Sequence, residues 1–195
     1  MKKKIVLFGA GGHAVSCIDV IEEENKYKIE CIFDKNPKNK IFKNYKVIQE
    51  NEKNIQSILN KKIYNVLISI GQIKTSQIRD NLFKKLKNKG FKFPVIKSPK
   101  CIISKKASID EGTIIFHNSV INAGAQIGKN CIINSSSLIE HGVKIGDNSH
   151  IATGAIINGD CEVANNSFVG SGSVLKQGLK LKKNSFIKMG SVVKK

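Results

Sequence analysis

Residues 133–157 read INSSSLIEHGVKIGDNSHIATGAII, and they belong to a pattern that repeats every six residues. An aliphatic side chain occupies every sixth position from Ile103 to Val193, and no insertion interrupts the series. The side chain four residues after each of these positions is usually small, and Gly or Asn commonly occupies the position before it. A helix has a period of about 3.6 residues and a strand a period of about 2, so neither produces this spacing. A parallel β-helix built from hexapeptides does.

The physical reasons for the pattern follow from the shape of such a coil. Each short strand directs its aliphatic side chain into the centre, and a small side chain such as Ala125, Cys131 or Cys161 fits the tight corner. Gly or Asn supplies the positive φ angles that the turns require. The sequence therefore predicts a parallel β-helix over residues 99–195.

Residues 1–98 lack the hexapeptide period and predict a small α/β domain of Rossmann-like type. Lys4 to Phe8 resembles a buried parallel strand, a helix follows the glycine-rich loop, and Ile29 to Phe33 resembles a second strand. Later elements are expected as helices at 51–60 and 75–89 and as strands at 65–70 and 93–96. The helix at 75–89 is expected to place Ile78, Leu82, Phe83 and Leu86 on its apolar face.

The glycine-rich loop satisfies the pattern Gly9-x-Gly11-x-x-Ala14, and Asp34 lies 20 residues beyond Ala14. The loop meets a helix N-terminus, where free backbone N–H groups and the helix dipole suit a phosphate. No residues typical of hydride transfer follow, so a nucleotide or nucleotide sugar fits this loop better than a redox role for NAD. The alternative is that the glycines only allow the helix to pack on the strand.

The composition restricts the class of protein. The net charge of +18 comes almost wholly from lysine, with Arg79 as the only arginine, and nucleic-acid readers usually rely on arginine. We therefore expect anionic small ligands and no nucleic acid as partners. No apolar run approaches the roughly 18 residues of a membrane span, the start of the chain does not match a signal peptide, and the five cysteines show no disulfide framework. We expect a cytoplasmic protein without a membrane partner.

Glu140 and His141 are adjacent ionisable residues on the repeat. Histidine is the usual general base near neutral pH, and a neighbouring carboxylate can orient it. Asn134 lies one repeat earlier and is a possible hydrogen-bonding partner or oxyanion donor. Residues about 18 apart stack in a three-sided coil, so His117, His141 and His150 do not share a line. A zinc site needs three or four converging ligands, so we expect no metal.

These motifs together are similar to those of the NeuD/PglD-type sugar O- and N-acyltransferases. The similarity rests on Gly9-Ala-Gly-Gly-His13-Ala14, on Asp34, on Ser69-Ile-Gly71-Gln, and on the segments from Asn134 to His141 and from Ile145 to His150. It covers nearly the whole chain in domain order and length. The resemblance implies a left-handed β-helix, a homotrimer with active sites between subunits, and acetyl-CoA as the acetyl donor.

The resemblance also implies roles for individual residues. His141 would be the general base, Glu140 would orient it, and Asn134 would line the same pocket. Two further groups are implied. Acceptor-binding residues would be Gly9, Gly11, Gly12, His13, Asp34, Lys35 and Gly71. Acetyl-CoA-binding residues would be His150, Ala152, Gly154, Gly170 and Gly172.

The predicted function is transfer of acetyl from acetyl-CoA to an amino group of a UDP-linked 4-amino-4,6-dideoxy sugar. O-acetylation of a sialic-acid-like nonulosonic acid is the alternative, because the same histidine base serves amines and hydroxyls. A non-catalytic scaffold of the same fold and a zinc-dependent enzyme similar to carbonic anhydrase are hypotheses from other classes.

Overall fold

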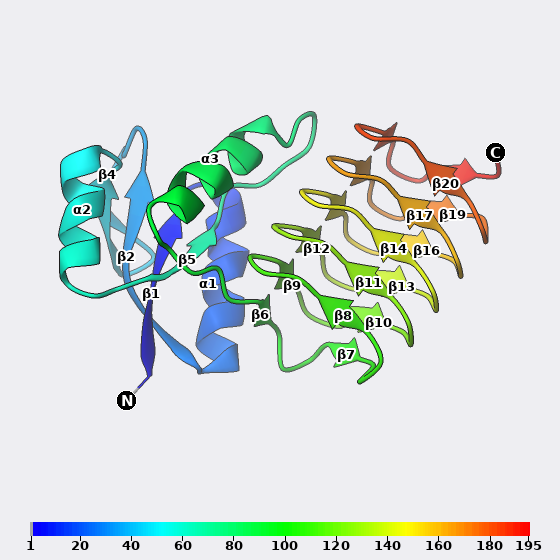
Figure 1. Cartoon of the computed structure of the whole chain (residues 1–195), viewed down its shortest axis with the longest axis horizontal. Coiled ribbons are helices and arrows are strands. Elements are labelled where there is room, and N and C mark those ends of the chain that lie inside the picture. The colour runs from blue at the N-terminus through cyan, green and yellow to red at the C-terminus, as the bar shows by residue number, and fades with distance from the viewer. Residues whose placement is uncertain (1) are drawn as a thin grey trace.

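A computed structural model describes residues 2–195 and shows an α/β domain followed by a β-helix (Figure 1). The α/β domain has five strands in the order β3-β4-β2-β1-β5, parallel except for β3, which pairs antiparallel with β4. Its strands are β1 (Lys3–Phe8), β2 (Tyr27–Asp34), β3 (Ile41–Phe42), β4 (Tyr45–Gln49) and β5 (Asn65–Ile68). Its helices are α1 (Gly12–Glu24), α2 (Glu52–Asn60) and α3 (Gln77–Asn88).

The helices cover both faces of this sheet. Helices α2 and α3 pack on one face through Ile55, Leu82 and Leu86, which join Phe8 and Phe33 in one buried cluster. Helix α1 covers the other face and also contacts the β-helix, so it lies between the two domains (Figure 1). This arrangement places the carboxyl ends of the parallel strands beside the β-helix, where Gln72 after β5 bonds to Asn148 and His150.

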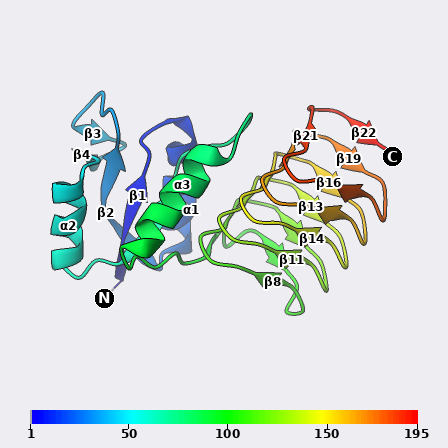
Figure 2. The ribbon, with the colours of Figure 1, turned by 45° about the horizontal axis from the view of Figure 1, so that its top comes forward.

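The second domain is a left-handed parallel β-helix with three faces (Figure 2). The covered face, next to the α/β domain, contains β6 (Ile96–Lys97), β9 (Ile114–Ile115), β12 (Ile132–Ile133), β15 (His150–Ile151), β18 (Phe168–Val169) and β21 (Phe186–Ile187). The aliphatic face contains β7 (Ile102–Ile103), β10 (Val120–Ile121), β13 (Leu138–Ile139), β16 (Ile156–Ile157), β19 (Val174–Leu175) and β22 (Val192–Val193). The polar face contains β8 (Ser108–Ile109), β11 (Gln126–Ile127), β14 (Lys144–Ile145), β17 (Glu162–Val163) and β20 (Lys180–Leu181).

Three corners connect the faces, and we number them in chain order. The first corner follows each covered-face strand, the second follows each aliphatic-face strand, and the third follows each polar-face strand. Strands of one face pair in register with strands 18 residues away, for example Ile132 with His150 and His150 with Phe168.

The hexapeptide pattern is confirmed in detail. All the aliphatic side chains of the series belong to one central core or pack against it. The position that usually holds Gly or Asn has a positive φ angle in every step from Gly112 to Gly190. Among these steps, only Ser136 and Asp160 are neither Gly nor Asn.

Two expectations for the α/β domain were wrong. The strand expected at 93–96 does not join the α/β sheet. Instead, Ile96 begins β6, which pairs with β9 as the edge of the covered face. Helix α3 leaves Ile78 exposed and buries Arg79, because the guanidinium group bonds to backbone carbonyls. No helix among residues 2–195 is long and apolar enough to cross a membrane.

Candidate active site

A cavity of about 680 Å³ opens at the carboxyl ends of the parallel strands in the α/β domain. Its wall comes from the loops after β1, β2, β4 and β5, from the first turn of α1 and from α3 between Ile78 and Lys85. Carboxyl edges of open α/β sheets are where ligands bind in such folds. The residues expected to bind the acceptor all line this one cavity, namely Gly9, Gly11, Gly12, His13, Asp34, Lys35 and Gly71.

The glycines of the loop serve different purposes. Gly9 has a φ angle of +110°, and a Cβ atom there would lie 2.5 Å from Cγ1 of Ile70, so packing requires glycine. Gly11 and Gly12 have open space where a Cβ would stand. Packing therefore explains the first glycine, whereas the other two keep the entrance to α1 free for a ligand.

Asp34 organises this loop from the end of β2. One carboxylate oxygen accepts a hydrogen bond from the Ala10 amide at 2.8 Å, and the other accepts one from the Asn36 amide at 2.9 Å. Both oxygens are thus committed to holding the backbone. The contribution of Asp34 to the cavity in this structure is the shape of the glycine loop.

His13 lies in the first turn of α1 and connects the cavity to the β-helix. Its ring packs edge-on against Phe116 with centroids 5.4 Å apart, and a Cβ on Gly71 would approach the His13 Cβ to 3.3 Å. Burial, together with the positive charge of Arg79, lowers the pKa of His13 to about 3. The ring is therefore neutral near pH 7, and its buried Nε2 atom has no hydrogen-bond partner among residues 2–195.

His150 lies on the covered face, against the loop that follows β5. The backbone oxygen of Gln72 can only accept, so Nδ1 of His150 donates to it at 2.6 Å and carries the proton. Burial lowers the pKa of His150 to about 4, so the ring is neutral near pH 7. Its Nε2 then accepts a hydrogen bond from the side-chain amide of Asn134 at 3.4 Å.

The residues expected to contact acetyl-CoA gather along the first corner, with His150 at its border. The Asn134 amide donates to the Ile151 oxygen of the next coil, and the Ala152 amide donates to the Val169 oxygen of the coil after that, both at 2.9 Å. Asn134, Ala152 and Gly170 therefore stack in three successive coils. A Cβ on Gly170 would lie 2.5 Å from the Met189 amide nitrogen, so the tight spacing of the coils requires glycine there. Gly154 and Gly172 have φ angles of +67° and +66° in the same corner.

His141 lies at the second corner, not the first. Its side chain is 59% exposed, and the ring covers Gly159, where a Cβ would lie 2.5 Å from the His141 Cε1 atom. Glu140 accepts a hydrogen bond from the backbone N–H of His141 at 3.2 Å and does not bond to the ring. The carboxylate facing the ring belongs to Asp160, whose Oδ1 is 3.9 Å from Nδ1 of His141.

Asp160 was missed from the sequence, although a signal exists. It occupies the left-handed corner position with a φ angle of 58°, where nearly every other step carries Gly or Asn. A Cβ on Gly142 would lie 2.3 Å from the Asp160 Oδ1, so this glycine makes room for the carboxylate. The sequence signal is an aspartate at a turn position that normally carries Gly or Asn, one coil after His141.

The aliphatic face separates His141 from Asn134. Its outward side chains are all aliphatic and form a continuous column along the coil. The column consists of Ile102, Val120, Leu138, Ile156, Val174 and Val192. Ile102 and Val192 at its ends are 67% and 65% exposed. Within one chain, therefore, the expected base and the expected acetyl-CoA residues flank the two edges of an apolar surface.

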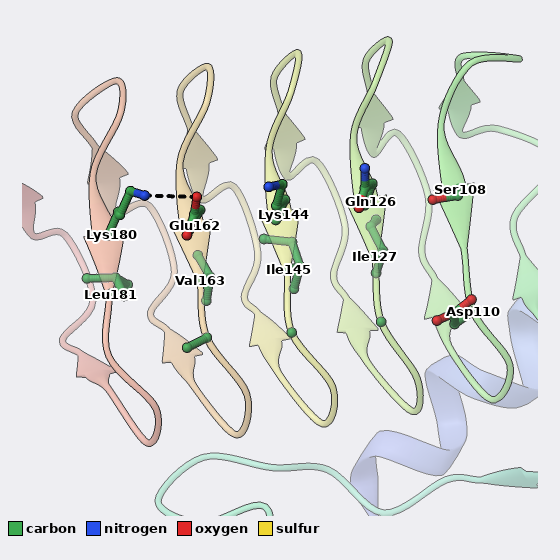
Figure 3. A pocket seen from close by; sticks show the side chains of 13 residues that line it. Ser108, Asp110, Gln126, Ile127, Lys144, Ile145, Glu162, Val163, Lys180 and Leu181 are labelled. Atoms are coloured by element: carbon green, nitrogen blue, oxygen red, sulfur yellow. Dashed lines mark ion pairs between the residues drawn. The ribbon is translucent and has the colours of Figure 1, made fainter.

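A second depression, of about 340 Å³, follows the polar face and holds none of the expected site residues (Figure 3). Its outward side chains are polar from coil to coil, and Lys180 pairs with Glu162 at 3.1 Å. The contrast with the aliphatic column shows that the polar face is built to contact solvent.

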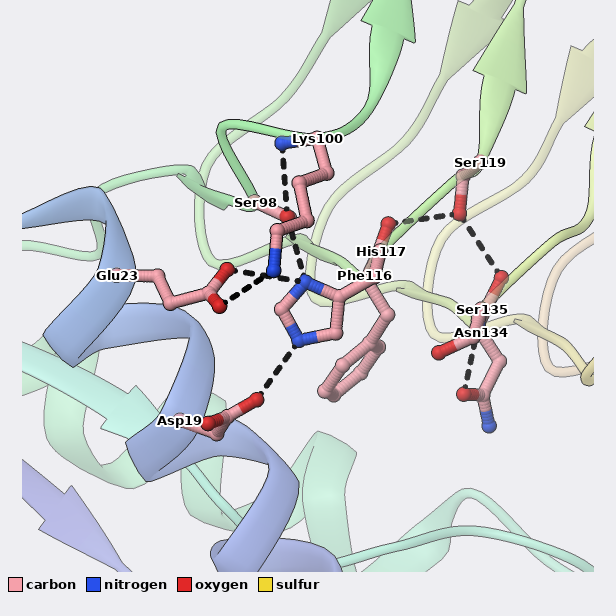
Figure 4. A network of polar contacts seen from close by, with 9 residues as sticks. All are labelled: Asp19, Glu23, Ser98, Lys100, Phe116, His117, Ser119, Asn134 and Ser135. Atoms are coloured by element: carbon pink, nitrogen blue, oxygen red, sulfur yellow. Dashed lines mark hydrogen bonds and ion pairs between the residues drawn. The ribbon is translucent and has the colours of Figure 1, made fainter.

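The zinc hypothesis can be compared with the structure. Among residues 2–195, one group of possible metal ligands comes together, formed by Asp19, Glu23 and His117 (Figure 4). His117 Nε2 is 2.8 Å from Asp19, and Lys100 pairs with Glu23 at 2.7 Å, so the group is a charged network that joins α1 to the first corner. His141 is not part of it.

Two family models match the chain. Residues 4–86 match the model described as the PglD N-terminal domain, and residues 97–195 match the model described as the GMPPB C-terminal domain. The second match covers half of the chain, and its start coincides with β6.

Solved structures share the whole two-domain architecture. The acetyltransferase domain of PglB from Neisseria gonorrhoeae, in complex with acetyl coenzyme A, has a TM-score of 0.89 at 22% identity, over 99% of this chain and 91% of that one. WeeI from Acinetobacter baumannii has a TM-score of 0.86 at 22% identity, over 100% and 92%. A mutant of perosamine N-acetyltransferase from Caulobacter crescentus, in complex with CoA and GDP-perosamine, has a TM-score of 0.77 at 20% identity, over 91% and 90%.

Proposed function

Since this chain belongs to the NeuD/PglD-type sugar O- and N-acyltransferase family, we propose that it transfers acetyl from acetyl-CoA to the amino group of a nucleotide-activated sugar. The observation that carries the proposal is the gathering of every expected acceptor residue around one cavity, beside the corner that holds the expected acetyl-CoA residues. A UDP-linked 4-amino-4,6-dideoxy sugar is the first choice of acceptor. The likeness to proteins whose structures contain acetyl coenzyme A, or CoA with GDP-perosamine, supports this class of reaction.

The acceptor cavity suits a nucleoside diphosphate. Open space at Gly11 and Gly12 leaves the first N–H groups of α1 accessible, and these groups and the helix dipole favour a phosphate. Lys35 adds positive charge to the wall, whereas Lys85 is paired with Glu50 at 3.1 Å. The sugar would then extend from the glycine loop past His13 toward the first corner.

The chemistry requires a base and two bond changes. His141 takes a proton from the amino group while the nitrogen attacks the thioester carbonyl carbon of acetyl-CoA. The new C–N bond forms, the C–S bond breaks, and the CoA thiolate leaves and accepts a proton. Asp160 faces the ring and stabilises the imidazolium that forms, whereas Glu140 fixes the backbone of the same corner.

We propose a homotrimer, because one chain does not bring His141 to the rest of the site. A cyclic assembly through the aliphatic faces is heterologous, so the second corner of one copy meets the first corner of the next. His141 of one copy would thereby join Asn134, His150 and the acceptor cavity of its neighbour. The aliphatic column supports this interface, because its six side chains are exposed or half-buried, and contiguous apolar side chains at the surface mark contact with another chain.

The reaction is proposed to occur in the cytoplasm. Cys17, Cys31, Cys101, Cys131 and Cys161 are all free thiols, and most are buried. Free cysteines and the absence of disulfides are typical of proteins in reducing compartments.

An acetyl-CoA consumption assay that follows free thiol tests the proposal. The acceptor panel contains UDP-4-amino sugars, GDP-linked 4-amino sugars, their hydroxyl analogues and nonulosonic acids. Turnover with an amino sugar nucleotide alone is the expected result. Turnover with a nonulosonic acid alone would replace the proposal with O-acetylation, and CoA binding without turnover on any acceptor would favour a scaffold.

The control variants are His141→Ala and His117→Ala. The first removes the proposed base and is expected to lose turnover while retaining CoA binding. The second removes a histidine of the charged network at α1, and its activity should remain close to that of the wild type. Equal loss in both variants would contradict the assignment of His141 as the base.

A further inference from the structure

Arg79 is the only arginine of the chain and lies in the first turn of α3. It is 1% exposed, and none of the ion pairs among residues 2–195 includes it. Leaving a guanidinium group buried without a carboxylate is costly unless its donors find other acceptors. The contacts of this side chain therefore point to a specific task.

One end of the guanidinium group holds the loop behind the acceptor cavity. Nη1 donates to the backbone oxygens of Ile68 at 2.8 Å and Ile70 at 2.6 Å. These carbonyls stand at the end of β5 and in the loop 69–76, and Ser69, Ile70 and Gly71 of this loop line the cavity.

The other end holds the β-helix. Nη2 donates to the backbone oxygen of Asn130 at 3.1 Å and to its side-chain oxygen at 2.8 Å, at the third corner. One residue thus bonds to both domains with one rigid, planar group. Lysine could not do the same, because its ammonium is a single point that cannot span the two sets of carbonyls.

The contact continues through amide side chains toward the expected donor site. Asn130 donates to the side chain of Asn148 at 2.8 Å, and Gln72 donates to the backbone oxygen of Asn148, also at 2.8 Å. The backbone oxygen of Gln72 then accepts from His150, which faces Asn134. This polar seam, made of Arg79, Asn130, Asn148, Gln72 and His150, connects the acceptor cavity to the first corner.

We propose that Arg79 is a positioning residue for acyl transfer, which fixes the loop 69–76 against the third corner and thereby sets the distance between bound acceptor and acetyl donor. The inference rests on the proposed function and adds to it a residue that touches neither substrate. A nucleophile and a thioester must be held in a defined position relative to each other, because a displacement of about 1 Å can lower the rate by about 100-fold. A clamp with two hydrogen bonds to the loop and two across the domain boundary meets that requirement.

The test compares Arg79→Lys and Arg79→Met with the wild type. Arg79→Lys keeps a positive charge but loses the fork, whereas Arg79→Met loses both. Thr113→Val is the matched control, since Thr113 is fully buried in the β-helix and bonds to neither Arg79 nor any other member of the polar seam; its hydroxyl donates to the Gly128 oxygen at 2.8 Å and accepts from the Cys131 amide at 2.9 Å. The full chain is used in each case. Turnover, the Kd values of CoA and UDP, and amide hydrogen exchange are measured.

We expect kcat to fall by about 100-fold in Arg79→Lys, while the Kd values of CoA and UDP change by less than about threefold. Amides of the loop 69–76 should exchange at least about tenfold faster, with the strands β9 to β18 unchanged. In Arg79→Met the pKa values of His13 and His150 should also rise, because the positive charge that helps to lower both is gone.

Two results would overturn the inference. One is a loop whose exchange in Arg79→Lys equals that in Thr113→Val. The other is a turnover that falls only in proportion to the folded fraction, as a purely structural bond would require. A wild-type protein that is inactive toward every acceptor would reject the proposed function, and the exchange result would then still decide whether Arg79 clamps the loop.

Discussion

Two inactive variants of this protein should restore each other's activity when they are combined in one oligomer. The variants are His141→Ala, altered at the second corner, and Asn134→Ala, altered at the first. The aliphatic face separates these corners within a chain. In the proposed trimer, a complete site therefore combines His141 of one copy with Asn134 of its neighbour. Neither pure variant contains such a site, whereas a mixed ring does.

The magnitude follows from counting interfaces in a ring of three. In an equal random mixture, about three quarters of the rings contain both variants, and each mixed ring has one interface with an intact His141 facing an intact Asn134. That interface is one of three, so about one quarter of all sites regain both groups. The unselected mixture should therefore show about one quarter of wild-type kcat per site, and rings purified through both tags should show about one third, while each pure variant stays near background.

The assay uses two differently tagged variants that are co-expressed and purified through both tags in turn. Native mass spectrometry gives the subunit composition, and the acetyl-CoA assay gives the turnover. The matched control pairs His141→Ala with Asp160→Asn, two changes at the same corner, 3.9 Å apart. Every copy in this mixture then lacks either the His141 ring or the Asp160 carboxylate at its second corner. The turnover of the mixed rings should therefore not exceed that of the pure variants.

Background activity in mixed rings of confirmed composition would refute the reasoning, because it would mean that His141 and Asn134 do not serve one site. Equal recovery in the control pair would refute it as well. In that case the activity would come from exchange or contamination and not from a shared interface.

Three further predictions concern the same corners and faces. Gly159→Ala should lower kcat by about tenfold or more with CoA affinity unchanged, since its Cβ would stand 2.5 Å from His141 Cε1 and push the ring aside; unchanged steady-state turnover would contradict the assigned ring position. Leu138→Glu, in the middle of the aliphatic column, should yield smaller particles without turnover in sedimentation velocity, whereas Lys144→Glu on the polar face should keep the wild-type mass. Stability should fall as the pH drops from about 6.5 toward 4, because the unfolded chain protonates histidine near pH 6.5 while the pKa values of His13 and His150 in the fold are about 3 and about 4. Unfolding temperatures of His150→Gln should depend less steeply on pH than those of the wild type, and parallel curves would show that His150 does not contribute.

The repeat could be predicted from the sequence because each of its determinants is local. Inward aliphatic side chains recur every six residues, and the turn position has a positive φ angle at each step from Gly112 to Gly190. The glycine loop was also recognisable, since Gly9, Gly11, Gly12 and His13 are consecutive or nearly so, and the loop meets a helix N-terminus. Chain order alone suffices for such features.

The contacts across the domain boundary could not be predicted in this way. Arg79 and Asn130 are 51 residues apart, and Gln72 and His150 are 78 apart, with no periodicity that connects them. An arginine within an amphipathic helix is usually solvated, so the pattern favoured Ile78 for the apolar face. Only the arrangement of the two domains shows that the Ile68, Ile70 and Asn130 carbonyls converge and make burial of Arg79 favourable.

The proposed division of the active site between copies comes from the family resemblance, and the period is consistent with it. Asn134 and His141 are seven residues apart, one hexapeptide plus one residue, so they must fall at successive corners with one face between them. The outward positions of that face recur every 18 residues, and from Ile102 to Val192 each is aliphatic, where a solvated face would carry polar residues as the polar face does. An apolar face flanked by two halves of a polar site is best explained by a ring of identical chains, since only a heterologous contact places one edge against the other. The same six-residue spacing that builds the coil thus also places the two halves of the proposed site at opposite edges of the aliphatic face.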